Sequence, residues 1–289
     1  MAVTGDDVAQ DAPEVACLME DLRRKCGLKP DDLLGRKIAG VLRQHPAGKR
    51  RAWADDLVAR APDDPAWLAF VETVTVHETY FFRDPAQLAV LSDRFLPALL
   101  ESRAAAGKRS LRLWSAGCAS GEEAYSAAIL VLDAIAARGE CARDWSITVL
   151  GSDISRTILA RAREGIYGGP GLNAFRRLPE RHARHFTPCT GERPGLRRIS
   201  DELAGLAVFC QHNLMDAQPP GTGFDIALCR NVFIYFDEAA QQRAVGALHR
   251  GLVDGGFLLL GVTDRLPPGS GFVREPCGTA VIYRREALS

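Results

Sequence analysis

The sequence predicts an α/β protein with a doubly wound, mostly parallel sheet, preceded by a small all-α domain. Three observations predict this architecture. Residues 15–82 show helical periodicity and no strand-like alternation. Beyond residue 110, apolar runs of strand length alternate repeatedly with helical stretches. Strands that are apolar along their whole length are typical of a parallel sheet with helices on both faces.

The composition is that of an ordinary globular protein. The 289 residues are 47% hydrophobic, and 36 basic residues balance 36 acidic ones. A neutral chain without a basic groove is not expected to bind nucleic acid. No apolar run reaches the about 20 residues that span a bilayer. Residues 1–14 are polar and acidic, unlike a secretion signal, and the eight cysteines form no CxxC pair. We therefore expect a cytoplasmic monomer that does not insert into a membrane.

Residues 1–84 are expected to form the helical domain and its joint to the rest of the chain. Within them, the range 33–53 contains six basic residues and no acidic one, and we expect a basic helix there. Such a run is either a solvated face or a docking face for an acidic helix. The sequence leaves both readings open.

Residues 85–289 are expected to form the α/β domain. The stretch 166–223 is longer than a crossover needs and rich in Gly, Pro and Arg, so we expect a small β-subdomain inserted at about 187–210. Its candidate strands are 195–200 and 206–213. The other expected elements are a helix at 85–106, a strand at 111–117 and its helix, a strand at 147–153, a helix at 156–165, a strand at 224–231, a helix at 237–252, a strand at 255–262 and an antiparallel pair within 271–285.

The carboxyl ends of the strands are where open α/β sheets bind ligands. The first strand ends in "SAGCASGEE", whose small residues let a ligand approach the backbone. Glu122 and Glu123 would repel a pyrophosphate but suit a positive centre, although acidic residues also cap a first helical turn. Asp153 ends the second strand, where it either takes ribose hydroxyls or caps the next helix. A ribose with a positive centre fits S-adenosylmethionine better than NAD.

Further ligand-type residues follow other strands. Arg230, Asn231 and Tyr235 come at the end of the third strand of the series, and Asn213 and Leu214 lie in the segment "QHNLMD". Taken singly, Asn213 could be a turn residue and Tyr235 a core aromatic with a solvated tip. Ligand-type residues at four strand ends together indicate a binding site.

Five segments, in this order, closely resemble those of the CheR-type chemotaxis receptor methyltransferases: "VHETYFFRD", "SAGCASGEEAYS", "GSDIS", "QHNLMD" and "FDIALCRNVFIYFD". The resemblance covers about residues 22–284. It implies a Rossmann-like S-adenosylmethionine methyltransferase sheet. It also implies methyl transfer from this cofactor to glutamate side chains on the cytoplasmic helices of chemoreceptors, with S-adenosylhomocysteine as the other product. The receptor would dock on the basic range 33–53 and on the β-subdomain.

The resemblance implies roles for individual residues as well. Arg83 and Tyr235 would face the reacting centre. The aromatic run 80–82 would pack the joint between the helical and sheet domains, so that the joint delivers Arg83 to the methyl group. His77 stands where the family usually has asparagine. The residues expected to line the cofactor site are His77, Thr79, Arg83, Glu123, Asp153, Asn213, Leu214, Arg230 and Asn231.

Two other readings are less consistent with the sequence. A non-catalytic adaptor that senses S-adenosylmethionine on a chemosensory array would have no use for Arg83 and Tyr235. A metal site is not expected, because 182–185 reads as a surface helix and the spacing of the candidate ligands matches no zinc template. Those candidates are His182, His185, Cys189, Cys210 and His212.

Overall fold

The computed structural model describes residues 12–168, 174–190 and 194–287. The prediction that the chain starts without a secretion signal concerns mainly residues 1–11, which lie outside the described residues. None of the described helices is long and apolar enough to cross a membrane.

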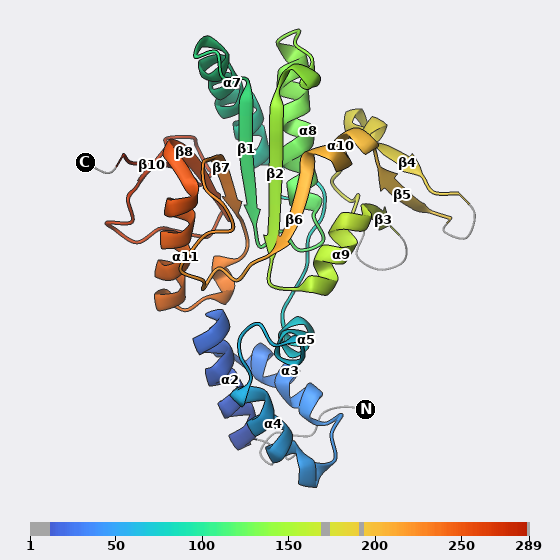
Figure 1. Cartoon of the computed structure of the whole chain (residues 1–289), viewed down its shortest axis with the longest axis vertical. Coiled ribbons are helices and arrows are strands. Elements are labelled where there is room, and N and C mark those ends of the chain that lie inside the picture. Colours follow the sequence, from blue (N-terminus) through green and yellow to red (C-terminus); the bar gives the residue numbers. More distant parts are fainter. Residues whose placement is uncertain (1–11, 169–173, 191–193, 288–289) are drawn as a thin grey trace.

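Four helices form a domain at the foot of the sheet (Figure 1). Two of them begin at aspartate caps, because Asp31 accepts a hydrogen bond from Leu34 N at 2.7 Å and Asp64 accepts one from Ala66 N at 2.8 Å. Their apolar faces meet in a core that contains the fully buried Trp67. The helices are α2 (Ala12–Cys26), α3 (Asp32–Leu42), α4 (Arg50–Ala59) and α5 (Pro65–Val74).

The basic range 33–53 is not a single helix, and that expectation is wrong. α3 ends at Leu42, a short 3₁₀ helix (Ala47–Lys49) follows, and α4 begins at Arg50. Pro46 has no N–H group to continue the helical hydrogen bonds. The exposed basic residues of this range are Arg36, Arg43, Lys49 and Arg51.

Lys37 does not belong to that exposed set. Its Nζ donates hydrogen bonds to the carbonyl oxygens of Val74 and Thr75, both at 2.9 Å, at the end of α5. A cation at a helix carboxyl end satisfies carbonyl groups that have no partner within the helix. Lys37 therefore stabilises the domain.

The main sheet has seven strands in the order β6-β2-β1-β7-β8-β10-β9. The first five pair in parallel, and β10 runs antiparallel to β8 and β9. In chain order the parallel part reads 3-2-1-4-5, which is the doubly wound arrangement, so the predicted fold class is confirmed. The strands are β1 (Ser110–Ala116), β2 (Ser146–Asp153), β6 (Ala207–Gln211), β7 (Phe224–Cys229), β8 (Leu252–Leu260), β9 (Phe272–Arg274) and β10 (Ile282–Arg285).

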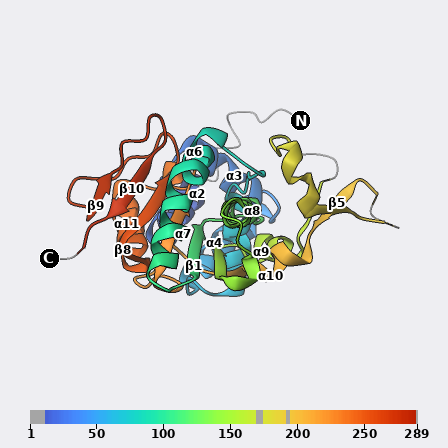
Figure 2. The same cartoon turned by 90° about the horizontal axis from the view of Figure 1, so that it is seen from above.

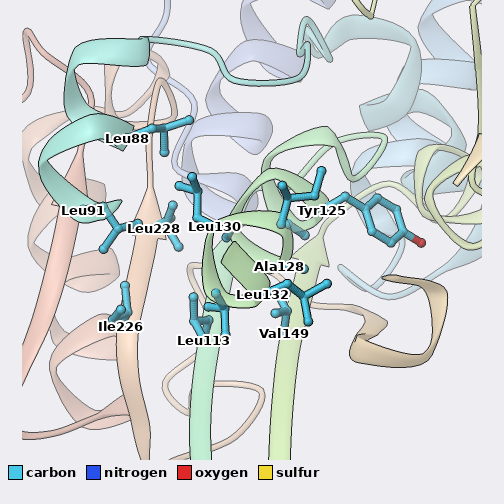
Figure 3. Packing of buried hydrophobic residues seen from close by; sticks show 14 of the residues in the cluster. Leu88, Leu91, Leu113, Tyr125, Ala128, Leu130, Leu132, Val149, Ile226 and Leu228 are labelled. Carbon is cyan, nitrogen blue, oxygen red and sulfur yellow. The ribbon is translucent and has the colours of Figure 1, made fainter. Parts of the chain in front are cut away.

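Helices cover both faces of this sheet. Side chains of β1 alternate, so that Leu113 packs in one core cluster and Trp114 in the other. Figure 3 shows the first cluster, where Leu228 of β7 lies beside Leu130 of α8 and Val149 of β2 lies beside Leu132 of α8. The second cluster lies under α11. The helices of this domain are α6 (Pro85–Val90), a π-helical turn (Leu91–Phe95), α7 (Leu96–Ala105), α8 (Glu122–Ala137), α9 (Arg156–Glu164), α10 (Asp201–Leu206) and α11 (Glu238–Gly251).

A small antiparallel sheet stands to one side of the main sheet (Figures 1 and 2). Its strands are β3 (Ile166–Gly168), β4 (Phe186–Pro188) and β5 (Leu196–Ile199), in the order β3-β5-β4. The insertion thus begins earlier than the expected 187–210. It also ends earlier, because the candidate strand 206–213 is β6, which pairs in parallel with β2 in the main sheet.

Candidate functional site

A pocket lies between the helical domain and the carboxyl ends of β1, β2, β6 and β7. Its space measures about 1330 Å³ with the open mouth included. Such a position, at the strand ends of a doubly wound sheet, is where ligands of this fold bind. All the residues that the sequence predicts for the site line this pocket: His77, Thr79, Arg83, Glu123, Asp153, Asn213, Leu214, Arg230, Asn231 and Tyr235.

Arg230, just after β7, holds the loop that carries Arg83. Its side chain is buried, and each guanidinium nitrogen has a protein partner. Nη2 donates to the carbonyl oxygen of Arg83 at 2.5 Å and to Asp84 Oδ2 at 3.1 Å. Nε donates to Gln87 Oε1 at 3.1 Å, and Nη1 to Glu123 Oε2 at 3.2 Å. Arg230 therefore connects the end of β7 to the loop of Arg83, to α6 and to α8.

Glu123, in the first turn of α8, presents a fixed carboxylate to the pocket. Its second oxygen accepts a hydrogen bond from Ser115 Oγ at 2.7 Å. Burial raises the pKa of Glu123, and the guanidinium of Arg230 opposes that rise. The guanidinium of Arg230 therefore holds the Glu123 carboxylate at a place where a positively charged ligand could lie.

The aromatic residues before Arg83 pack against the insertion. Phe81 is fully buried and contacts the rings of Tyr167, Phe175 and Phe186 at centroid distances of 4.9, 5.4 and 4.8 Å. The expectation that the run 80–82 packs the joint between the helical and sheet domains is therefore wrong. These rings instead anchor the loop to the insertion and to the core under α8.

Arg83 itself is partly buried at the pocket wall. Its Nη1 donates a hydrogen bond to the carbonyl oxygen of Glu78 at 2.7 Å, and its guanidinium lies 5.7 Å from the ring centre of Tyr80. These contacts hold the side chain and leave further N–H groups able to bind an anion.

Contacts between the two domains position Tyr235. Its carbonyl oxygen accepts a hydrogen bond from Lys29 N at 2.8 Å, and Leu28 forms a β-bridge with Phe236. Burial raises the pKa of Tyr235, and the nearby Arg83 opposes the rise. The phenol is therefore a neutral hydrogen-bond donor at neutral pH.

Gly27 allows the close approach of the two domains. Its φ is +73°, and a Cβ there would lie 2.6 Å from Ala240 Cβ and 2.6 Å from Met215 Sδ. Only glycine fits both the left-handed backbone and this contact. The end of α2 thus sits directly on the sheet domain beside the pocket.

Asp153, the last residue of β2, has both oxygens engaged by backbone donors. Oδ2 accepts from Ala119 N at 2.9 Å and Oδ1 from Ser155 N at 3.0 Å. The helix cap is Ser155, whose Oγ accepts from Ile158 N at 3.1 Å. Burial raises the pKa of Asp153, and these backbone donors oppose the rise. Each oxygen retains a lone pair for a hydroxyl donor of a ligand.

Asn213 is both a turn residue and a residue of the pocket wall, the two interpretations that the sequence leaves open. Its Oδ1 accepts from Met215 N at 3.0 Å, as in a turn, and its Nδ2 donates to the Lys25 carbonyl oxygen at 2.8 Å in the helical domain. The side chain nevertheless lines the pocket next to the buried Leu214. His77 also lines the pocket, and its Nε2 lies 2.9 Å from Thr75 Oγ1.

Left-handed backbone concentrates at this site. Among the described residues, four non-glycine residues have positive φ: Phe82, Asp84, Ala119 and Asn231. Phe82 and Asp84 flank Arg83, Ala119 bonds to Asp153, and Asn231 follows Arg230. Such conformations cost about 1–3 kcal/mol each and persist where the surroundings impose them, which is common at functional sites.

Several residues of the site are not evident from the sequence. Asp84 and Gln87 hold Arg230, and Gln87 also donates to the Leu260 carbonyl oxygen at 2.9 Å. The helical domain supplies Asp31 and Lys37 to the pocket wall. Gln87 is buried on an otherwise apolar helical stretch, and that mismatch is the one signal that could have marked it.

Glu122, next to Glu123, is buried but does not line the pocket. Its Oε2 accepts a hydrogen bond from Ser120 Oγ at 2.7 Å. Burial nevertheless raises the pKa of Glu122 to about 7.

We expect Glu122 to make stability depend on pH. The carboxyl loses its proton near pH 4.5 in an unfolded chain and at about pH 7 in the fold, so the folded state holds the extra proton between these values. Stability should therefore fall as the pH rises from 4.5 to about 7, by on the order of 3 kcal/mol at most. Urea unfolding of Glu122→Gln should show a smaller fall over this pH range, whereas the exposed Glu101→Gln should keep the wild-type fall. Parallel pH curves for wild type and Glu122→Gln would contradict the assignment.

The fold and the pocket together define a nucleoside-binding α/β protein with a carboxylate-rich site. A family model, the S-adenosylmethionine-binding domain of CheR methyltransferases, matches residues 77–278. A chemotaxis protein methyltransferase of Vibrio parahaemolyticus is 34% identical over 218 residues, which are 75% of this chain and 75% of that protein. Chemotaxis protein methyltransferase 1 of Pseudomonas aeruginosa is 32% identical over 74% of this chain and 76% of that protein. The chain belongs to the CheR methyltransferase family and is an S-adenosylmethionine-dependent methyltransferase.

Likeness to solved structures is weaker. A TehB-like S-adenosylmethionine-dependent methyltransferase from Corynebacterium glutamicum is 15% identical with a TM-score of 0.34, covering 68% of this chain and 98% of that one.

The residues present fit S-adenosylmethionine. Asn231 Oδ1 is buried without a hydrogen-bond partner, which leaves an acceptor for a ligand donor. Glu123 and Asp153 supply negative charge and hydroxyl acceptors, while Leu214 and Ile154 supply apolar contact. This combination suits a nucleoside that carries a positive centre.

Proposed function

We propose that the protein transfers a methyl group from S-adenosylmethionine to glutamate side chains of chemoreceptor cytoplasmic domains, giving glutamate methyl esters and S-adenosylhomocysteine. The observation that carries the proposal is the meeting of Arg83 and Tyr235 in one pocket with Glu123 and Asp153. The names of the curated relatives, chemotaxis protein methyltransferases, support the receptor as the substrate.

The reaction needs few groups from the protein. S-adenosylmethionine would supply an activated methyl group on a sulfonium. A glutamate of the receptor is already ionised at neutral pH, because its pKa is about 4.3, so no general base is required. Arg83 would bind one carboxylate oxygen and orient the other, which is positioning and not activation. The neutral phenol of Tyr235 would donate a hydrogen bond to the substrate carboxylate or to the cofactor.

We also propose which residues of the pocket contact S-adenosylmethionine. Asp153 would accept the ribose hydroxyls, and Glu123 would face the positively charged end of the ligand. Asn231, Asn213 and His77 would add polar contacts. Leu214 and Thr79 would line the remaining wall, and Arg230 would hold the Arg83 loop.

Replacing Asp153 with alanine tests the ribose contact. We expect the dissociation constant for S-adenosylmethionine, measured by calorimetry, to rise about 10- to 100-fold, since hydrogen bonds to a charged acceptor contribute about 1.5–3 kcal/mol. Asp237→Ala is the matched control, because Asp237 caps α11 through Ala240 N at 2.8 Å but does not line the pocket. An unchanged constant in a folded Asp153→Ala protein would count against the assignment.

The receptor would dock next to the pocket mouth. We assign the contact to the exposed basic residues of α3 and α4, which would face an acidic receptor helix, and to the small sheet of the insertion. The protein would act as a monomer in the cytoplasm, where the cytoplasmic parts of receptors lie. Light scattering of the purified protein tests the monomer, and fractionation of the cell tests the location.

One experiment tests the function directly. Candidate receptor domains are incubated with the enzyme and S-adenosylmethionine, and mass spectrometry of the digested domains locates methyl esters. We expect esters on glutamates of the receptor helices. The alternative is a sensor that binds the cofactor without transfer, and it is supported if calorimetry shows binding while no candidate receptor gains a methyl ester.

A further inference from the structure

Two histidines of the insertion meet an aspartate of α8 outside the pocket. His182 and His185 lie in the 3₁₀ helix η4 (Glu180–His185), where about three residues make one turn, so they share one face. They are 0% and 5% exposed, whereas Arg181 and Arg184 are exposed, so the helix lies at the surface as expected but buries its two histidines. Asp133 of α8 faces them, and potential ligand atoms of the three residues all lie within 4.8 Å of one another.

The histidines lack the hydrogen bonds that buried polar groups normally have. Both ring nitrogens of His182 and Nε2 of His185 are buried without a hydrogen-bond partner. Nδ1 of His182 lies 3.3 Å from Asp133 Oδ2 but does not form a hydrogen bond with it. Buried polar atoms without partners are rare and call for an explanation, such as an ion.

One pair of these ligand atoms has the spacing of metal coordination. With metal–ligand bonds of about 2.1 Å, two ligands of a tetrahedral ion lie about 3.4 Å apart. The 3.3 Å between His182 Nδ1 and Asp133 Oδ2 agrees with this edge. Imidazole and carboxylate are ligands that zinc and related ions take, and sites with three protein ligands keep a position for water. We propose that Asp133, His182 and His185 bind a divalent transition-metal ion of the zinc type.

The neighbouring charges are compatible with such an ion. Arg184 Nη2 donates to Asp133 Oδ1 at 2.6 Å, which orients the carboxylate and leaves Oδ2 to the ion. The Arg184 side chain is 60% exposed, so solvent screens its charge.

The site would connect the insertion to the loop of Arg83. The ring of His182 stacks on Phe82, with centroids 4.5 Å apart and an angle of 3° between the planes. Phe82 N in turn donates a hydrogen bond to Ser126 Oγ of α8 at 3.0 Å. An ion on His182 would therefore link α8, the insertion and the loop that ends in Arg83, independently of the substrate that the enzyme methylates.

Metal titration of the full-length protein tests the site. Zinc is added in competition with a chromophoric chelator, and bound metal is counted after dialysis. The wild type should bind one more equivalent than His182→Phe, which keeps a ring against Phe82 but has no nitrogen ligand. His185→Gln should lose the same equivalent. The control His249→Asn should keep it, because His249 also has a buried ring nitrogen without a partner but lies outside the cluster.

The chain has eight free cysteines, and a second measurement separates them from the proposed ligands. Cobalt bound to imidazole and carboxylate shows no thiolate charge-transfer band, whereas cobalt bound to cysteine does. We expect the equivalent that His182→Phe loses to lack this band, with an unchanged circular dichroism spectrum. The proposal is overturned if folded His182→Phe and His185→Gln bind as much metal as the wild type, or if the lost equivalent shows the thiolate band.

Discussion

Replacing Arg83 with alanine is expected to reduce methyl transfer at least about 100-fold and to leave the fold intact. The side chain is the group that would align the incoming carboxylate, and misplacing a reacting group by about 1 Å costs roughly this factor. The measurement is the turnover of labelled methyl groups onto a receptor domain, with the melting temperature as the check of folding. Arg83→Lys should recover part of the turnover, because lysine keeps the charge but not the planar geometry.

Arg176→Ala is the matched control for this prediction. Arg176 stacks on Tyr80 at 3.8 Å and pairs with Glu78 at 2.7 Å, so it touches the same loop, but it does not line the pocket. Its removal should leave turnover within about twofold of the wild type, as is usual for an exposed ion pair. Near-normal turnover by Arg83→Ala would remove Arg83 from the mechanism.

Replacing Arg230 with methionine is expected to destabilise the fold by about 3–5 kcal/mol, because breaking a buried ion pair leaves charges without a partner. Glu123 and Asp84 would both lose their guanidinium. The Arg83 carbonyl oxygen would lose its donor as well, so turnover should fall along with stability. Urea unfolding gives the free energy of unfolding, and the transfer assay gives the turnover.

Arg51→Met provides the comparison for Arg230. Arg51 pairs with Asp55 at 3.0 Å, and both side chains are exposed. Surface pairs contribute about 0–1 kcal/mol, so this change should have little effect. If Arg230→Met unfolds with the same free energy as Arg51→Met, the network around Arg230 does not stabilise the site.

Much of the fold could be predicted because local patterns determine it. The strand ending in Asp153, the cap at Ser155 and the terminal Gly165 are all visible in the sequence and are present in the structure. The residue at which β8 begins could not be predicted in this way. The pair Gly255–Gly256 reads as the start of a strand, but Gly255 has φ +75° within a strand that already begins at Leu252, where the pairing with β7 is irregular.

The residues that line the pocket could be predicted one by one, but the contacts that hold them could not. Each motif lies at a strand end, and parallel strands bring their carboxyl ends to one edge. What the aromatics before Arg83 contact depends instead on the insertion, whose path no local pattern fixes. The same holds for Asp133 and His182, which are far apart in the sequence and meet only because the insertion folds back on α8. The contact of Lys37 with the end of α5 cannot be predicted from the basic run 33–53, because α5 comes later in the chain.

The walls of the pocket come from two separately packed cores, and Gly27 lets the smaller one rest against the larger. A small molecule held between the two domains binds only while they are associated in the native arrangement. Its binding free energy therefore adds to the free energy that keeps the two domains associated. Saturating the protein with its nucleoside ligand should therefore merge any separate melting of the halves into one cooperative transition at higher temperature.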